Sequence, residues 1–364
     1  MSRAGAAAGS QPQTLTEPSQ PAVGDHQVTC RLNEELMSTE RPPVTNIIFG
    51  TMTLSYRGYG SRVHDTETAA MLTMYFDAGY RALDTAHAYG GGSGEQMLGD
   101  LGAAQRFTIA TRYDPQGANH AQERDKLKAA LRLSLTRLRT DRVRILYLTT
   151  RDHSVPLEST LRGIQDLHDE GLFDEFGLSN FSVADIEDVL AITTREGWIR
   201  PTVYQGLYNA LARVVETELF PSLAAHGMRF QAYNPLAGGA FAPNFGTEDS
   251  VADGSRFDLA GPQGRMYRDR YWSDAYISTR QSLHAVCAQF DIDAISAALR
   301  WLVHHSKLDS DRDDAIIIGA SSMAHLQHNL SAVKQGPLPR PVLDAINSAS
   351  ETVRPHWPSY FFVL

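Results

Sequence analysis

The sequence has little cysteine, no long apolar run and no basic cluster, and each absence excludes a class of protein. Cys30 and Cys287 are the only cysteines among 364 residues, too few for a disulfide framework or a cysteine-based zinc site. No stretch reaches the roughly 18 consecutive apolar residues of a membrane span. The formal net charge is −9, without runs of lysine and arginine. Nucleic acid and membrane surfaces are therefore not expected partners.

The first 43 residues are rich in Ala, Gly, Ser, Pro and Gln and contain no apolar core of a secretory signal. Such a composition buries too little apolar surface to offset the entropy lost on ordering. We therefore expect a disordered leader over residues 1–43 and one folded domain over residues 44–364. With neither a signal nor a span, the expected location is the cytoplasm.

From residue 45 onward, short β-rich runs alternate with stretches whose apolar residues recur at helical spacing, such as 125–138 and 158–171. Alternating strand and helix units predict a parallel sheet, and eight of them predict a closed (β/α)8 TIM barrel, which is an α/β fold. An open, doubly wound sheet is the alternative. The eight expected strands are residues 45–50, 81–85, 107–111, 144–148, 175–179, 202–205, 229–233 and 315–319.

Two segments fall outside this alternation. Residues 240–273, after the seventh strand, are rich in Gly, Asp, Phe, Tyr and Arg and show no clear period. A long insertion at the C-terminal end of a barrel strand is typical of a lid or binding loop. The aromatic and apolar C-terminal tail, residues 354–364, is expected to pack against the barrel mouth or a partner subunit.

The chemistry of a TIM barrel gathers at the C-terminal ends of its strands. The histidines and acids expected there have no compact metal-ligand spacing, so we expect no metal site. The glycines after Tyr89 do not form a dinucleotide fingerprint, because that motif lies directly between the first strand and its helix. The residues expected at this end are Asp84, His87, Tyr89, Thr111, Arg112, Thr149, His153, Ser179, Asn180, Gln205, Tyr233, Asn234, Gly319, Ser321 and Ser322.

Several of these residues lie in a run of motifs. The stretch GYRALDTAHAYGGGSGEQMLG, residues 79–99, resembles the aldo-keto reductase signature. GLSNF, PTVYQGLYNALAR, AYNPLAGG and GASSMAHLQHNL follow it in the family's order. The resemblance covers about residues 47–360 and is closest to the aflatoxin-aldehyde and succinic semialdehyde reductase branch. It implies a (β/α)8 barrel that binds NADPH without a Rossmann fold and reduces carbonyl groups.

The resemblance also implies four catalytic positions, and two of them are changed here. The family uses Asp, Tyr, Lys and His; Asp84 and Tyr89 match the first two, whereas Arg112 stands at the Lys position and Thr149 at the His position. Arginine keeps the cation that tunes a phenol but cannot relay a proton. Threonine keeps a hydroxyl donor but has no imidazole. His87, two residues before Tyr89, either delivers the proton or lines the pocket wall.

By resemblance, the cofactor residues are largely kept. Their alternative role is to cap strand ends and pack the core. His325 and His328 stand where the branch has amides, which leaves NADH open beside NADPH. The expected cofactor-binding residues are Ser179, Asn180, Gln205 and Tyr233 at the nicotinamide, Asn234, Pro235, Leu236 and Gly238 near the pyrophosphate, and Gly319, Ser321, Ser322, Gln327 and Asn329 at the adenosine end.

For the substrate, the resemblance places Arg270 where a family arginine binds a carboxylate, although an arginine in a charged loop is often only solvated. His153 is a substrate-site candidate with a structural alternative. The predicted function is NADPH-dependent reduction of an aldehyde or ketone by a remodelled tetrad, on a specialised biosynthetic or detoxification substrate. The alternatives are acid catalysis without hydride, as in a lyase, isomerase or cyclase, and an NADPH-binding sensor or scaffold subunit. A homodimer is suggested by the resemblance alone.

Overall fold

The structure is a computed structural model that describes residues 43–56, 61–113, 122–242, 245–246, 251, 253, 255–261 and 263–361. The expected leader, apart from Pro43, lies outside the described residues. Within the described ranges, no helix combines the length and apolar character needed to cross a lipid bilayer.

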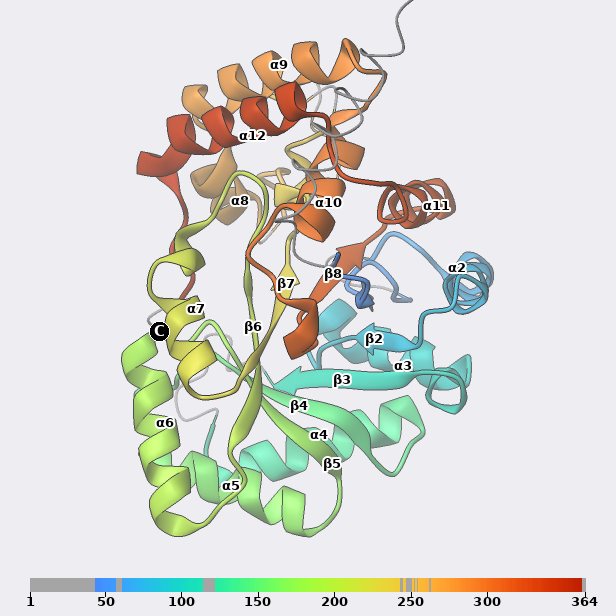
Figure 1. Ribbon diagram of the computed structural model, residues 1–364. Helices are drawn as coiled ribbons and strands as arrows, with labels where there is room; N and C mark the ends of the chain where they lie inside the picture. The colour runs from blue at the N-terminus through green and yellow to red at the C-terminus, as the bar shows by residue number, and fades with distance from the viewer. Residues whose placement is uncertain are drawn as a thin grey trace, which may run out of the picture. The chain divides into compact units, whose positions relative to one another are not determined.

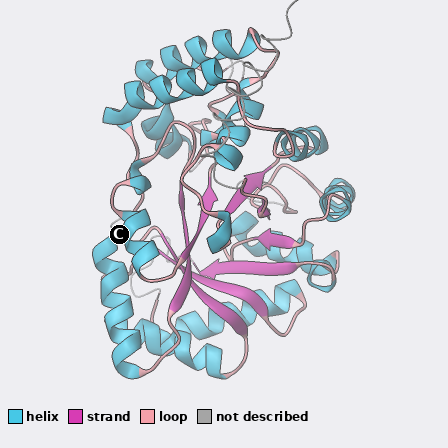
Figure 2. Cartoon of the chain, viewed as in Figure 1, coloured by secondary structure: helices cyan, strands magenta, loops and turns pink. Residues whose placement is uncertain are grey.

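Eight parallel strands follow one another around a closed barrel (Figures 1 and 2). The first strand pairs with both the second and the eighth, which closes the sheet and excludes the open alternative. Every expected run overlaps one of the strands. These are β1 Ile47–Gly50, β2 Ala82–Asp84, β3 Thr108–Tyr113, β4 Val143–Thr149, β5 Phe173–Ser179, β6 Pro201–Leu207, β7 Arg229–Tyr233 and β8 Ala315–Gly319.

The strands are recognisable in the sequence because a parallel barrel buries both strand faces, which favours unbroken apolar runs. Ile145, Tyr147 and Val203 belong to a buried cluster on the inward face. The outward face packs on helices in the main hydrophobic core. The helices after β1 to β6 are α2 Asp65–Asp77, α3 Ser93–Asp100, α4 Arg124–Leu138, α5 Leu157–Asp169, α6 Val183–Glu196 and α7 Leu219–Ala225.

Residues at both ends of α6 define where this helix begins and ends. At α6, Ser182 accepts a hydrogen bond from the Asp185 backbone nitrogen, and the Asp185 side chain accepts from Ser182 in return. This capping box satisfies two amides that the first turn leaves unpaired. The helix ends at Gly197, whose φ of 66° suits a residue without a Cβ.

The insertion after β7 contains a helix that the sequence pattern did not indicate, α8 Gly264–Tyr271. Its buried face combines Tyr267 and Tyr271 with Arg270, so no apolar period is visible. The chain continues through α9 Asp274–Ala288 and α10 Ala294–His304, then β8 and the helices α11 Met323–Ala332 and α12 Arg340–Val353. Helices α9 and α12 lie side by side (Figure 1).

The described part of the C-terminal tail packs on its own chain. Tyr360 is buried, and its hydroxyl donates a hydrogen bond to Glu218, just before α7.

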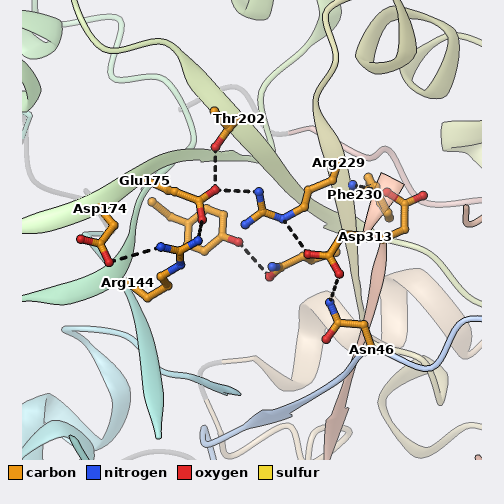
Figure 3. A network of polar contacts seen from close by, with 11 residues as sticks. Asn46, Arg144, Asp174, Glu175, Thr202, Arg229, Phe230 and Asp313 are labelled. Carbon is orange, nitrogen blue, oxygen red and sulfur yellow. Dashed lines mark hydrogen bonds and ion pairs between the residues drawn. The ribbon is translucent and has the colours of Figure 1, made fainter. Parts of the chain in front are cut away.

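The N-terminal ends of the strands are closed by a polar network (Figure 3). Glu175 accepts hydrogen bonds from Arg229 Nη1 at 2.6 Å and Thr202 Oγ1 at 2.8 Å, and pairs with Arg144 Nη2 at 2.7 Å. Asn46 Nδ2 donates to Asp313 Oδ1 at 3.0 Å. Because barrel chemistry lies at the opposite end, we read this network as structural.

Candidate active site

The turn that carries Tyr89 is held against β3 by the backbone. After β2 ends at Asp84, the His87 amide donates to the Arg112 carbonyl at 3.0 Å. The chain then makes the 3-10 turn Tyr89–Gly92, in which three successive glycines have φ values of 57°, 64° and 92°. Residues with a Cβ rarely adopt this left-handed conformation. The glycines therefore build the turn into α3.

Asp84 and Arg112 form a buried ion pair. Arg112 Nη2 donates to Asp84 Oδ2, and Gln205 Nε2 donates to Asp84 Oδ1 at 2.8 Å. Asp84 is 3% exposed. Burial raises the pKa of Asp84 above its usual value, although Arg112 acts to lower it. Burial acts to lower the pKa of Arg112, but Asp84 and Tyr89 outweigh it, and the net change is upward. The arginine therefore stays charged.

Tyr89 lies beside this cation. The Arg112 Cζ atom is 5.8 Å from the centroid of the Tyr89 ring. Burial raises the pKa of Tyr89, and the charge of Arg112 opposes the rise without reversing it. Tyr89 is therefore a protonated phenol near neutral pH, the form that can donate a proton.

Three buried polar atoms form a row at the ends of the next strands. Thr149 pairs in register with Ser179, and Ser179 with Gln205. Thr149 Oγ1, Ser179 Oγ and Gln205 Oε1 have no hydrogen-bond partner within the described ranges. A buried polar atom without a partner costs about 1–3 kcal/mol. A row of three such atoms fits a polar ligand.

Tyr233 ends β7 and Asn234 follows it, and the two side chains have different hydrogen-bond partners. Tyr233 Oη donates to Asn180 Oδ1 at 3.0 Å, and burial raises the pKa of Tyr233 to about 12. Asn234 Nδ2 donates to Tyr271 Oη at 3.0 Å, while its Oδ1 accepts from the Gly238 amide at 2.6 Å. Asn234 thus ties the turn through Pro235, Leu236 and Gly238 to α8.

Gly238 cannot carry a side chain in this turn. Its φ is 70°, and a Cβ would lie 2.5 Å from the ring of Tyr267. Arg256 Nη1 donates to the hydroxyl of the same tyrosine at 2.6 Å. Tyr267 and Arg256 both act electrostatically on Tyr89. Sequence reasoning had missed both as neighbours of this corner.

At the end of β8, the expected adenosine-site residues divide into structural and accessible ones. Asn329 is buried and donates from Nδ2 to the Gly319 carbonyl at 3.0 Å. Ser322 caps α11 by accepting from the His325 amide at 3.2 Å. Ser321 Oγ lies 3.0 Å from His325 Nδ1, and Gln327 is exposed.

A carboxylate that sequence reasoning had missed lies beside them. Glu67 Oε1 accepts from the Met323 amide at 3.0 Å, at the first residue of α11.

His87 faces α4. Its Nδ1 lies 3.1 Å from Ser134 Oγ and 3.5 Å from Arg137 Nη1, and burial with the nearby Arg137 lowers its pKa. Its ring meets Tyr113 edge to face, with centroids 5.8 Å apart. This ring thus contacts Ser134, Arg137 and Tyr113, and the role of His87 stays a prediction.

Behind the Tyr89 turn lies a clamp formed by Glu95 and Arg137. Glu95 is fully buried and accepts from Thr111 Oγ1 at 2.7 Å. Arg137 Nη1 lies 3.5 Å from Glu95 Oε2 and donates to the His87 carbonyl at 3.3 Å. A Cβ on Gly92 would lie 2.3 Å from Arg137 Cζ. In the sequence, Glu95 is only an acidic residue in the first turn of α3.

The two candidate substrate-binding residues, Arg270 and His153, differ in exposure. Arg270 is 8% exposed, so the solvated alternative for it is wrong. Its charge acts on Tyr233. His153 is exposed after β4. A cavity of about 590 Å³ between α8 and the tail is lined by Arg265, Met266, Asp269, Arg270, His356, Trp357, Pro358 and Ser359.

Comparison with known proteins assigns the chain to a family. The model of the aldo/keto reductase family matches residues 46–351. Human aflatoxin B1 aldehyde reductase member 2 is 38% identical over 342 residues, covering 89% of this chain and 92% of that protein. Human aldo-keto reductase family 7 member A3 is 39% identical over 313 residues, covering 83% and 94%. Oxidoreductase sirO of Leptosphaeria maculans is 32% identical over 278 residues, covering 76% and 84%. The chain belongs to the aldo/keto reductase family and is a nicotinamide-dependent oxidoreductase.

Proposed function

We propose that this protein reduces an aldehyde or ketone to an alcohol with NADPH, and that Tyr89 donates the proton. The observation that carries the proposal is the row of unpartnered buried atoms at Thr149, Ser179 and Gln205 beside the Asp84–Arg112 pair. A row of acceptors and hydroxyls next to a protonated phenol is what a bound carboxamide and a reacting carbonyl both require.

The residues present fit a nicotinamide cofactor. Gln205 Oε1 can accept from a carboxamide N–H and Ser179 Oγ can donate to its oxygen, while Tyr233 offers an aromatic face. Ser321, Ser322 and Gln327 would meet the adenosine end. When bound, the reduced nicotinamide supplies the hydride. The choice of NADPH over NADH rests on the family resemblance.

The protein's own residues supply the proton. Tyr89 donates its phenolic proton to the carbonyl oxygen as the carbonyl carbon gains hydride, which gives the alcohol and leaves a phenolate. Arg112 stabilises that phenolate, and Asp84 holds Arg112 in place. Thr149 Oγ1 donates a hydrogen bond to the same carbonyl oxygen. Tyr89 then regains a proton from solvent, because an arginine cannot relay one.

The substrate class and setting extend the proposal. Arg270 and the cavity beside α8 offer a cationic and aromatic wall for the distal part of a substrate. Four of the relatives are named as aflatoxin B1 aldehyde reductases, which supports a detoxification or biosynthetic carbonyl substrate. A cytoplasmic homodimer is part of the same proposal.

The test starts with binding. Titrations of the purified protein with NADPH and NADH, followed by cofactor fluorescence, precede a panel of aliphatic and aromatic carbonyl compounds. We expect saturable binding, stronger for NADPH, and oxidation of the cofactor with one carbonyl class. Tyr89→Phe should keep binding and lose turnover by about 10²- to 10³-fold.

Other outcomes would indicate a different function for the barrel. No binding of either cofactor contradicts the proposal. Tight binding without turnover of any carbonyl compound indicates a sensor subunit. Product formation without cofactor oxidation indicates acid catalysis without hydride.

A further inference from the structure

A strained backbone position follows the last residue of β4. Thr149 ends the strand, and Thr150 has a φ of 59°. This left-handed region is rare for residues with a Cβ, and a β-branched residue in it is an outlier. The left-handed residues that follow β5 and β7 are asparagines, Asn180 and Asn234, and asparagine tolerates this conformation. The end of β4 therefore carries strain that the ends of β5 and β7 avoid.

The side-chain amide of Gln122, just before α4, holds this position. Its Nε2 donates to the Thr150 carbonyl at 2.8 Å, and its Oε1 accepts from the Asp152 amide at 3.2 Å. A backbone carbonyl only accepts and a backbone amide only donates, so the glutamine amide can take only one orientation. One side chain thus fixes the backbone on both sides of Arg151.

Gln122 is itself anchored at its backbone. It is 1% exposed. Its amide donates to Asp152 Oδ2 at 3.1 Å, and its carbonyl accepts from Thr160 Oγ1 of α5 at 3.0 Å. All four polar groups of Gln122 therefore have partners. Backbone strain persists only where the surroundings over-determine the conformation, and Gln122 supplies that constraint for Thr150.

The conformation of Thr150 bears directly on Thr149. The Thr150 amide donates to the Ser179 carbonyl at 2.8 Å, so β5 holds one side of this residue and Gln122 holds the other. Thr149 Oγ1 is one of the three atoms of the row that are buried without a partner in the described part of the chain. If Thr150 relaxed to a negative φ, the peptides on either side would move, and the end of β4 with Thr149 would move with them.

We infer that Gln122 is a positioning residue, which holds Thr150 left-handed and thereby fixes the direction in which Thr149 Oγ1 donates a hydrogen bond to the carbonyl oxygen of the substrate. The inference rests on the proposed function, since it requires a carbonyl substrate at Thr149. It assigns a role in the reduction to a buried side chain that holds two backbone groups of the strand end.

A double-mutant cycle in steady-state kinetics tests the inference. Gln122→Leu removes both amide hydrogen bonds with little change in volume, and Thr149→Val removes the hydroxyl that is positioned. We expect Gln122→Leu to lower kcat about three- to tenfold, the range for one net hydrogen bond. It should leave the Kd for NADPH unchanged, because Thr149 meets the substrate. In a Thr149→Val background, Gln122→Leu should cause no further loss of kcat.

Gln165→Leu is the matched control. Gln165 Oε1 also holds a backbone group, since it accepts from the Ile199 amide at 2.7 Å, but this group lies before the first residue of β6, at the opposite end of the barrel. The control should leave kcat unchanged.

Thr150→Gly tests the strain directly, because glycine adopts the left-handed region readily. Combined with Gln122→Leu, it should restore most of the lost kcat. Gln122→Met, which follows the shape of glutamine more closely, serves if Gln122→Leu does not fold.

An unchanged kcat in Gln122→Leu, or an equal further loss in the Thr149→Val background, would overturn the inference while leaving the proposed function intact. A raised Kd for NADPH in Gln122→Leu, or a loss of kcat that Thr150→Gly does not relieve, would overturn it as well. Failure of the unmodified protein to bind a nicotinamide cofactor or to reduce any carbonyl compound would overturn the proposed function and the inference together.

Discussion

The buried pair of Asp84 and Arg112 gives the sharpest stability prediction. Arg112→Met removes the cation and leaves the carboxylate of Asp84 3% exposed without its partner. Breaking a buried pair from one side costs about 3–5 kcal/mol of unfolding free energy, whereas replacing both partners by neutral groups costs little. We therefore expect Arg112→Met to lose about 3–5 kcal/mol, and Asp84→Asn with Arg112→Met to recover most of it.

The pH dependence separates the two single variants. Burial already raises the pKa of Asp84 in the intact pair, and without Arg112 it rises further. A group with a raised folded pKa contributes stability at low pH that is lost as the pH rises through that value. Arg112→Met should therefore be less destabilised at about pH 5 than at about pH 8. Asp84→Asn instead removes the titrating carboxylate and leaves a buried arginine that cannot discharge, so this variant should lack the pH dependence that Asp84 gives the unmodified protein.

Urea denaturation followed by circular dichroism at both pH values measures these differences, with the unmodified protein as reference at each. If the double variant loses the sum of the two single losses, the two groups are not coupled and the reasoning fails. A loss in Arg112→Met that is independent of pH would refute the account of Asp84.

Three further predictions follow from particular contacts. Gly92→Ala should lower the free energy of unfolding by about 1–3 kcal/mol, because the φ is left-handed and the new Cβ would clash with Arg137. It should also lower kcat more than it raises KM. A stability equal to that of Gly91→Ala, where the new Cβ would meet no atom within 4 Å, would contradict the clash. His87→Phe should change kcat little and Arg137→Met should lower it, because Arg137 holds the turn of Tyr89; the reverse order in steady-state kinetics would make His87 the proton donor. His305 accepts from the Leu338 amide at 2.9 Å, and burial lowers its pKa to about 4. As the pH drops, His305 gains a proton in the unfolded protein but not in the native protein, so the free energy of unfolding falls between about pH 6.5 and 4, by up to about 3 kcal/mol. His305→Gln should make this fall smaller in urea titrations. An unchanged dependence of stability on pH would disprove the assignment.

The barrel could be predicted from the sequence because its strands are buried on both faces and leave runs such as residues 315–319. The positions of Asp84, Arg112 and Gln205 followed from the rule that strand ends meet. Helix α8 could not be predicted, since its buried face is tyrosine and arginine.

Contacts between side chains of distant elements could not be predicted from the sequence either. Gln231 meets Tyr147 from 84 residues away. Arg137 on α4 donates to the His87 carbonyl, in the turn of Tyr89, from 50 residues further along the chain. No local pattern encodes either contact, because each depends on the closure of the barrel.

The closure of the barrel also places Arg112, which stands where the family resemblance implies a lysine. The Arg112 Cζ atom lies 5.8 Å from the centroid of the Tyr89 ring and 5.9 Å from that of the Tyr147 ring. One fixed cation thus lies next to two phenols, that of Tyr89, the proposed proton donor, and that of Tyr147. A permanent charge retains both electrostatic roles and gives up only the proton relay. Under the proposed function, Arg112 keeps a positive charge beside Tyr89, and the hydroxyls of Thr149 and Ser179 are neutral donors in the row.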